Sequence, residues 1–403
     1  MANINITEAQ KTLFGLVGQA LFSAPFDSSD TVDWDAVIRE SRAQSVALLA
    51  CTNYRALPVG EENAARLKIG LKKCTLANFN CYRGHKYLHE LMTKNNIPYC
   101  IIKGVASARY YPDPLLRAMG DVDFYIAPPH LEKAKEVFIA EGFELSWEDH
   151  PHHFKLQKGT MRMELHFAPA GYPSEAVRVA FTEYWSDLCE KANLITFELG
   201  EYFLPSDFHH GFILLSHFQS HLISSGVGLR HVCDWAVFAN SFSNEEFVSV
   251  FEAKLKRVGL WRLAQILSLA AVKHLGMPYQ PWMGDANDLA DTLIEEISNS
   301  GNFGRRARER YYENIFVADG RRVGSEKTRF SRAFRTLNSI VKHRWPVAKK
   351  CPILYPFGWF WFSMRFLFLL MIGKRKCNLV ETYQQSGKRL KLYQNLDLLN
   401  PEE

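Results

Sequence analysis

The chain has 403 residues, of which 47% are hydrophobic and 23% are charged, and this is enough for two domains or one large core. The net charge of +5 is mild and excludes a uniformly basic chain. The charge is nevertheless uneven, because residues 301–350 contain 14 Lys and Arg against 4 Asp and Glu, a balance of +10 that leaves −5 for the rest. A concentrated basic segment can contact phosphates or an anionic membrane surface.

The cysteines and the start of the chain both indicate a reducing compartment. Eight cysteines are scattered through the sequence without a Cys-x-x-Cys pair. The first residues, which include Asn3, Asn5 and Glu8, do not form a basic segment followed by an apolar one, as a secretory signal would. We therefore expect reduced thiols and a cytoplasmic protein.

The first 95 residues are predicted to form a small helical subdomain without chemistry of its own. Thr7 is expected to start a first helix, whose apolar stripe runs through Leu13 and Leu21. The apolar spacing predicts further helices over Trp34–Leu49 and Ala64–Lys94.

A strand-to-helix junction follows at Lys103-Gly104. Ile97–Ile102 is predicted to be a strand and Val105–Tyr111 a helix. A glycine at such a junction lets backbone N–H groups approach a phosphate, and the helix N-terminus adds a positive dipole end. We favour phosphate binding, assisted by Lys103 and Ser107, over a glycine that merely makes the turn.

Arg117, just before the next strand, has two interpretations that the sequence leaves open. Its guanidinium can reach a triphosphate with a fork of donors, or it can pair structurally with Asp113 or Asp121.

Two carboxylates lie one residue apart at the start of a predicted strand, Gly120–Ile126. Asp121 and Asp123 share one face of that strand because strand side chains alternate. Burying two like charges together is costly unless a cation neutralises them, and a hard divalent metal ion is the usual solution.

A third carboxylate is available on the strand Met161–Phe167, which alternates without a break. Met163 and Leu165 fall on one face, whereas Glu164 and His166 fall on the other. If this strand lies beside the first, Glu164 completes a cluster able to hold one or two Mg²⁺ ions, or Mn²⁺ in their place. An amphipathic helix over His130–Glu141 is expected to back the sheet.

These motifs resemble the bacterial family of uncharacterised nucleotidyltransferases, within the polymerase β-like superfamily. The resemblance is carried by Ile102-Lys103-Gly104, Tyr110-Tyr111-Pro112-Asp113-Pro114, Arg117, Gly120-Asp121-Val122-Asp123, Glu141-Gly142-Phe143 and Met163-Glu164-Leu165-His166-Phe167. It implies an α+β fold, a mixed sheet flanked by N-terminal and C-terminal helical regions. It also implies metal-dependent transfer of an NMP from an NTP to an acceptor hydroxyl, with release of pyrophosphate. The implied metal ligands are Asp121, Asp123 and Glu164, and the implied nucleotide-binding residues are Lys103, Gly104, Ser107 and Arg117.

The sequence departs from the superfamily at two points. Its third carboxylate is Glu164, where Asp is commoner, and its glycine motif precedes Asp121 by 17 residues without the usual Gly-Ser or Gly-Gly.

Histidines occur in two groups beyond the carboxylates. His150, His152 and His153 are interpreted as exposed loop histidines rather than a zinc site, because no cysteine lies nearby. His217 and His221 share one face of a predicted helix, but no third zinc ligand is evident.

The resemblance gives this second half of the chain another interpretation. Members of the family carry a His-x-x-x-His helix followed by a segment like Leu229–Trp235. The polar groups His166, His217, His221, Arg230 and Asp234 would then line the cleft, with a polar network between helices as the alternative.

The C-terminal region combines basic and apolar segments. Gly301–Ser325 is predicted to be an exposed linker, in which Arg305, Arg306, Arg308 and Arg310 contact RNA or membrane, or are simply solvated. The 16-residue segment Phe357–Ile372 is largely apolar but contains Arg365, which is costly inside a membrane. As a helix it would span only about 24 Å, less than the ~30 Å membrane core. We expect either a buried helix or a helix on a membrane surface. In the second case residues 357–376 are in peripheral contact with the inner membrane.

We expect four regions: a helical subdomain over 1–95, a catalytic core over 96–200, a helical domain over 201–300 and a C-terminal region over 301–403. The sequence does not identify the NTP, nor whether the acceptor is a sugar, a protein or an RNA. Two alternatives remain open: an inactive membrane-peripheral scaffold in surface-polysaccharide assembly, and a toxin-like enzyme that modifies tRNA or protein through the segment 305–335.

Overall fold

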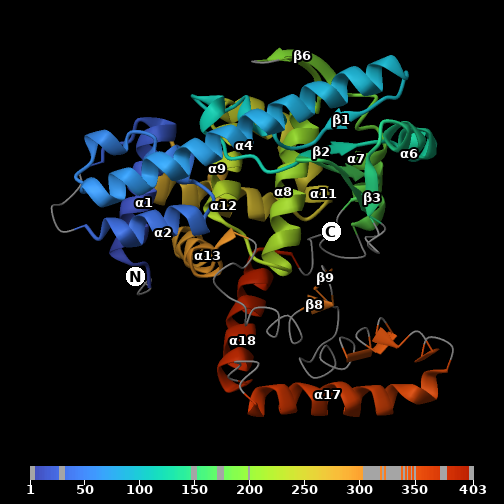
Figure 1. The fold of residues 1–403 in the computed structure, drawn as a ribbon. Coiled ribbons are helices and arrows are strands. Elements are labelled where there is room, and N and C mark those ends of the chain that lie inside the picture. Colours follow the sequence, from blue (N-terminus) through green and yellow to red (C-terminus); the bar gives the residue numbers. More distant parts are fainter. Residues whose placement is uncertain are drawn as a thin grey trace.

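The computed structural model shows an α+β fold whose mixed sheet lies between helical layers (Figure 1). The structure describes residues 5–26, 32–146, 152–169, 177–197, 200–302, 351–372 and 379–398, with short pieces at 318–319, 322–323, 337–338, 341–342, 344–345 and 347–348. The predicted linker and the basic segment 305–335 lie almost wholly outside these residues.

The N-terminal region is helical, as predicted. Its helices are α1 (Glu8–Phe22), α2 (Trp34–Ala43), α3 (Ala47–Cys51) and α4 (Glu61–Lys94), with the short η1 (Tyr54–Ala56) before α4. Thr7 caps α1 through a reciprocal pair of hydrogen bonds with Gln10, which satisfies two donors at the helix start. The predicted second helix is divided in two, because Ser45 has a left-handed backbone between α2 and α3.

Five strands form one sheet, in the order β1-β2-β5-β4-β3. Their bounds are β1 (Cys100–Ile101), β2 (Val122–Tyr125), β3 (Glu144–Ser146), β4 (His153–Lys158) and β5 (Met161–His166). β2 and β5 are parallel neighbours, and all other neighbours in this sheet are antiparallel. The parallel register pairs Asp123 with Glu164, so the two strands expected to lie side by side do so.

The two faces of the sheet differ in character. On one face Val122, Phe124, Met163 and Leu165 are buried in an apolar cluster with residues of α4 and α6 (Leu131–Ala140). Because strand side chains alternate, Asp123 and Glu164 are left on the opposite face. The predicted helix after the glycine motif is shorter than expected and forms α5 (Val105–Ala108).

A hairpin that the sequence did not reveal extends this cluster. It consists of β6 (Asn193–Phe197) and β7 (Gly200–Leu204), and it follows α7 (Arg178–Ser186). β7 contacts both α4 and β1, and it contributes Tyr202 and Leu204 to the apolar cluster.

Helices return after the hairpin, and the first two of them face the carboxylate side of the sheet. They are α8 (Asp207–Ile223), α9 (Leu229–Ala239), α10 (Asn244–Phe247), α11 (Ala253–Arg257), α12 (Trp261–Leu275) and α13 (Asn287–Ser300). Short turns of helix connect several elements: η2 (Pro114–Leu116), η3 (Pro128–His130), the π-helical η4 (Val248–Glu252) and η5 (Pro281–Met283).

One apolar cluster joins α1 to α12 and α13, so the N-terminal helices and the helices after the sheet share a core. The four-region division remains a prediction.

The C-terminal region contains the two-residue strands β8 (Ala318–Asp319) and β9 (Arg322–Val323), η7 (Pro352–Leu354), α17 (Tyr355–Met371) and α18 (Leu379–Asn395). α18 is fixed to the body, since Tyr393 and Arg389 donate hydrogen bonds to the carbonyls of Leu222 and Ile223 at the end of α8. α17 lies at the far end of the molecule from the sheet (Figure 1).

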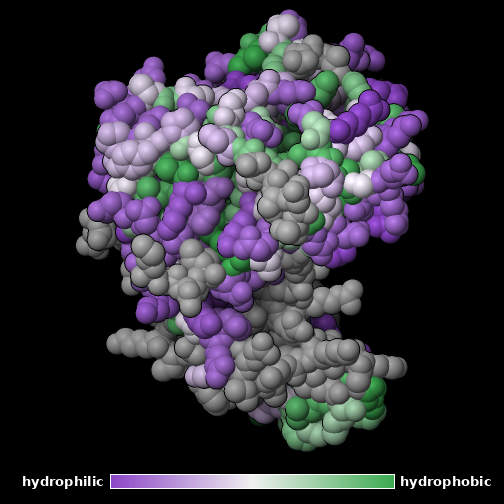
Figure 2. Space-filling model, turned by 90° about the vertical axis from the view of Figure 1, so that its left-hand side faces the viewer, coloured by the Kyte–Doolittle hydropathy of each residue, from purple (hydrophilic) through white to green (hydrophobic). Residues whose placement is uncertain are grey.

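α17 is largely exposed, so the interpretation of this segment as a buried helix is wrong. Its most exposed apolar side chains are Phe357, Phe360, Trp361, Phe368 and Met371. Hydrophobic residues gather at the lower end of the molecule in Figure 2, where Figure 1 places this helix. Among the described residues, no helix is both long enough and apolar enough to cross a membrane.

Candidate active site

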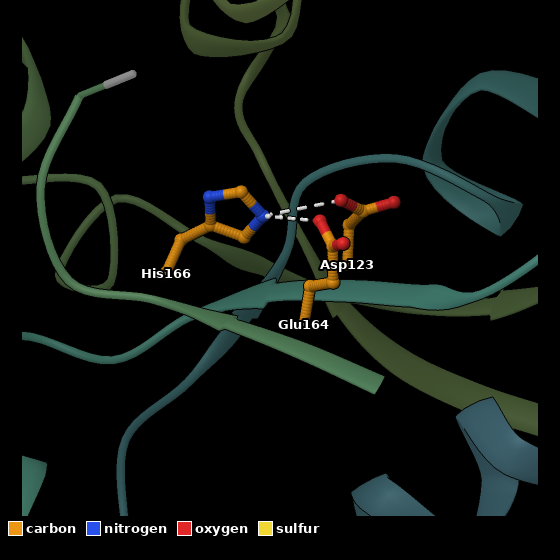
Figure 3. Close-up of side chains that lie close together, drawn as sticks. All are labelled: Asp123, Glu164 and His166. Carbon is orange, nitrogen blue, oxygen red and sulfur yellow. Dashed lines mark hydrogen bonds and ion pairs between the residues drawn. The ribbon is translucent and has the colours of Figure 1, made fainter. Parts of the chain in front are cut away.

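Three side chains meet on the carboxylate face of the sheet (Figure 3). Asp123 comes from β2, and Glu164 and His166 come from the neighbouring β5. Nε2 of His166 donates to Oδ1 of Asp123 at 3.1 Å and lies 3.7 Å from Oε2 of Glu164. One donor atom from each residue lies within 4.8 Å of the others, a spacing at which the three can share one metal ion.

Lys103 provides the positive charge nearest to these acids. Its Nζ donates to Oδ1 of Asp123 at 2.6 Å. Burial alone would raise the pKa of Asp123, but Lys103 and the hydrogen bond from His166 outweigh it and hold that pKa well below its usual range. Glu164 behaves similarly, because burial raises its pKa but the neighbouring His166 and Lys103 lower it further than burial raises it. Both carboxylates are therefore ionised near neutral pH.

Asp121 lies at the edge of this group, one residue before β2. The charge of Asp123, followed by burial, raises the pKa of Asp121 to about 6. Lys103 therefore does not neutralise the whole acidic set, and a further cation would be stabilised here. Oxygen donors with one imidazole beside them fit a divalent metal ion.

The acids form one wall of a cavity of about 250 Å³. Every predicted site residue lines it: Lys103, Gly104, Ser107, Arg117, Asp121, Asp123, Glu164, His166, His217, His221, Arg230 and Asp234. The cavity lies between the sheet, the start of α5 and the helices α8 and α9. The structure thus brings together residues that are more than 130 positions apart in the sequence.

Gly104 has the backbone geometry that its role as a junction requires. Its φ is +62°, and a Cβ at this position would lie 2.4 Å from Nε2 of His85 on α4. His85 is completely buried, and burial lowers its pKa to about 4. Nδ1 of His85 donates to the carbonyl of Cys81 at 2.8 Å, so its Nε2 carries the lone pair and faces Gly104.

Nothing in the local sequence indicated that His85 lies near the site, because a single histidine in a long helix has no distinguishing pattern. Ser107 is also completely buried, and its hydroxyl has no hydrogen-bond partner among the residues that the structure describes.

Arg117 forms a buried ion pair, but neither of its expected partners takes part. Its Nε and Nη2 donate to the two carboxylate oxygens of Asp234, both at 2.7 Å, and the Tyr111 hydroxyl donates to the same carboxylate. The pairing with Asp113 or Asp121 was therefore wrong. Sequence separation explains the error, since Asp234 follows Arg117 by 117 residues.

Arg230 is the second arginine in the cavity. Its Nη1 donates to the carbonyl of Ala118 at 3.2 Å, just ahead of the carboxylate strand. Burial and the neighbouring Arg117 lower the pKa of Arg230, while Asp234 and Asp121 oppose that shift. A half-buried cation that, among the described residues, donates to the Ala118 carbonyl is well placed to receive an anionic group of a ligand.

The histidines near the β4–β5 hairpin are buried, so their interpretation as exposed loop residues is wrong. His152 and His153 are only 5% and 6% exposed, and His150 lies outside the described residues. β4 begins at His153, which pairs in register with His166, and Nε2 of His153 lies 4.0 Å from Oε1 of Glu164. The sequence pattern predicts a strand over Phe154–Gln157, one residue after the true start of β4, and this left His153 in a loop.

The helical wall contributes His217 and His221 of α8 together with His231 of α9. Nε2 of His217 and Nε2 of His221 are 3.2 Å apart. The sequence did not point to His231 as part of this group, because only the packing of α9 on α8 brings it there.

Comparison with known proteins gives one finding that bears on this geometry. A family model described as uncharacterised nucleotidyltransferase matches residues 30–276, which include both walls of the cavity. No curated protein matches the chain.

Proposed function

Because the chain belongs to the family of uncharacterised nucleotidyltransferases, we propose that its cavity catalyses metal-dependent transfer of an NMP from an NTP to an acceptor hydroxyl. The observation that carries the proposal is the register of β2 and β5, which places Asp123 directly beside Glu164. Asp121, Lys103 and Arg230 line the same cavity. The proposed site therefore offers carboxylates for cations and cations for phosphates.

Asp121, Asp123 and Glu164, with His166 beside them, are the residues that would hold Mg²⁺ or Mn²⁺. Bound there, a divalent ion would neutralise charge on the triphosphate and make the acceptor hydroxyl more acidic. The donor chemistry supports this assignment, since Lys103 donates to Asp123 and yet the charge of Asp123 still raises the pKa of Asp121.

Lys103, Gly104 and Ser107 are proposed to bind the phosphates. The positive φ of Gly104 turns the backbone into α5, so that N–H groups at the start of this helix can face a phosphate, while His85 lies on the side of the missing Cβ. The buried Ser107 hydroxyl supplies a further donor. We assign phosphate binding to Arg230 and a positioning role to Arg117, because Asp234 already accepts hydrogen bonds from Nε and Nη2 of Arg117.

The proposed reaction is an in-line displacement at the α-phosphorus. The acceptor oxygen forms a bond to this phosphorus, the bond from phosphorus to the bridging oxygen of the β-phosphate breaks, and pyrophosphate leaves with the electron pair. The acceptor proton passes to Glu164, whose lowered pKa keeps it ionised and able to accept.

A second, separate proposal concerns α17. Its exposed aromatic side chains and its length of about 26 Å, shorter than a ~30 Å membrane core, support a helix that lies on a membrane surface. In the sequence Lys374-Arg375-Lys376 follows this helix, and such charges favour anionic headgroups. We propose that α17 attaches the protein peripherally to an anionic membrane.

The transfer reaction is tested by incubating the protein with each α-labelled NTP, Mg²⁺ or Mn²⁺, and a cell extract. Label should appear on an extract component with the wild type, and not with the Asp121→Ala/Asp123→Ala variant. Digestion with protease, nuclease or glycosidase would then identify the acceptor class. Equal labelling by the double variant would show that these carboxylates do not perform the transfer.

A further inference from the structure

The helical wall of the cavity carries three histidines that the proposed nucleotide chemistry does not use. His217 and His221 follow each other by one helical turn on α8, and His231 lies on the adjoining helix α9. The ring centroids of His231 lie 6.2 Å from His217 and 5.7 Å from His221, and the two α8 rings are 4.3 Å apart. Three imidazoles therefore gather at one place across the cavity from the carboxylates.

We propose that His217, His221 and His231 form a second metal site, which binds one transition-metal ion of the Zn²⁺ type. Imidazole nitrogens suit Zn²⁺ and similar ions, whereas carboxylate oxygens suit Mg²⁺. A set of imidazoles without carboxylates therefore favours a Zn²⁺-type ion over Mg²⁺ at the helical wall.

The geometry of the α8 pair supports this assignment. Two ligands of a tetrahedral zinc ion with Zn–N bonds of about 2.0–2.1 Å are roughly 3.3 Å apart. The Nε2 atoms of His217 and His221 are 3.2 Å apart. Each Nε2 must present a lone pair to the metal, so the proton of each ring has to reside on Nδ1.

Ser225 supplies a contact of the kind that fixes such a tautomer. Its Oγ lies 3.0 Å from Nδ1 of His221 and can accept the Nδ1 proton. Metal-bound histidines usually donate their other ring N–H to a nearby oxygen in this way. The neighbouring Ser224 differs, because its hydroxyl donates to the carbonyl of Ser220.

His231 of α9 is the third ligand of the proposed set, and its ring lies beside the pair. Centroid distances of roughly 5 Å are expected for histidines on one zinc ion, from the Zn–N bond length and the size of the ring. The distances from His231 exceed this by about 1 Å. Within the described part of the chain, the group whose donor atoms all lie within 4.8 Å of one another is Asp123, Glu164 and His166, and not the three histidines. The fourth position of the histidine site would face the cavity, as in zinc sites that bind a ligand.

The test is zinc binding by the full chain after dialysis against a chelator, measured by calorimetry and elemental analysis. The wild type is expected to bind one Zn²⁺ more than His217→Gln or His221→Gln, and Glu164→Gln should keep that ion. Binding of Co²⁺ in place of zinc should give visible absorption bands typical of a tetrahedral site. This readout does not require nucleotide, so it is independent of the proposed transfer reaction.

A serine pair provides a matched control that leaves all three histidines intact. Ser225→Ala should weaken zinc binding by about 10- to 100-fold, because it removes the oxygen beside Nδ1 of His221. Ser224→Ala should bind zinc like the wild type. The proposal is overturned if the wild type takes up no zinc, if both glutamine variants keep it, if Glu164→Gln loses it, or if the two serine variants bind equally.

Discussion

Replacement of Gly104 with alanine should destabilise the fold through two effects that can be separated. Gly104 combines φ +62° with ψ −115°, outside the left-handed helical region, so a side chain there costs at least the ~1–2 kcal/mol of that region in backbone strain. The added Cβ would also lie 2.4 Å from Nε2 of the buried His85, and overpacking of this kind costs about 1–3 kcal/mol more. The two effects predict a loss of about 2–5 kcal/mol in the free energy of unfolding.

Urea denaturation of Gly104→Ala beside Gly159→Ala measures the two effects. Gly159 has a similar φ of +58° with nothing within 4 Å of its added Cβ, so this variant should lose only the strain of about 1–2 kcal/mol. Adding His85→Ala to Gly104→Ala should cost less than the sum of the single changes, because the contact is relieved. Equal losses for the two alanine variants would refute a close approach of α4 beneath the glycine.

Three further outcomes follow from the structure. Asp234→Asn should lower the free energy of unfolding, measured by urea denaturation, by about 3–5 kcal/mol, because Arg117 is left buried without its charge partner. The control Asp207→Asn, at an exposed ion pair, should change it by less than about 1 kcal/mol. Mn²⁺ affinity should fall as the pH is lowered through about 6, since Asp121 then takes up a proton that competes with the ion, and calorimetry should show a flatter pH profile for Asp121→Asn. Trp361→Glu should reduce co-sedimentation with anionic vesicles without affecting nucleotide binding, and unchanged sedimentation would remove α17 from the membrane proposal.

The fold could be predicted from the sequence wherever the local pattern was strong. The alternation through Met161–Phe167 identified β5, and the spacing of apolar residues identified α4 and α6. The β6–β7 hairpin was missed. Most of β6 is exposed, so its sequence does not show the alternation of buried and exposed residues that marks a half-buried strand.

Most residues of the candidate site could be predicted from the sequence because they fall in two recognisable segments. The structure gathers those residues around one cavity, but their roles in binding and catalysis stay predictions. Partners fixed only by packing could not be found, namely Asp234 for Arg117, His85 beneath Gly104, and His231 beside the α8 pair. No local pattern marks contacts between residues far apart in the sequence.

The central claim is that the acids on β2 and β5 bind an NTP together with a divalent metal ion. The most direct measurement is the affinity for each NTP with and without Mg²⁺, for the wild type, Glu164→Gln, Asp123→Asn and a control change at the exposed Asp288 of α13. We expect binding of the NTP to depend on Mg²⁺. The affinity of both site variants should fall by at least about tenfold, equal to about 1.4 kcal/mol, while Asp288→Asn keeps the wild-type affinity. Binding that does not depend on Mg²⁺, or that survives in folded Glu164→Gln and Asp123→Asn, would contradict the central claim.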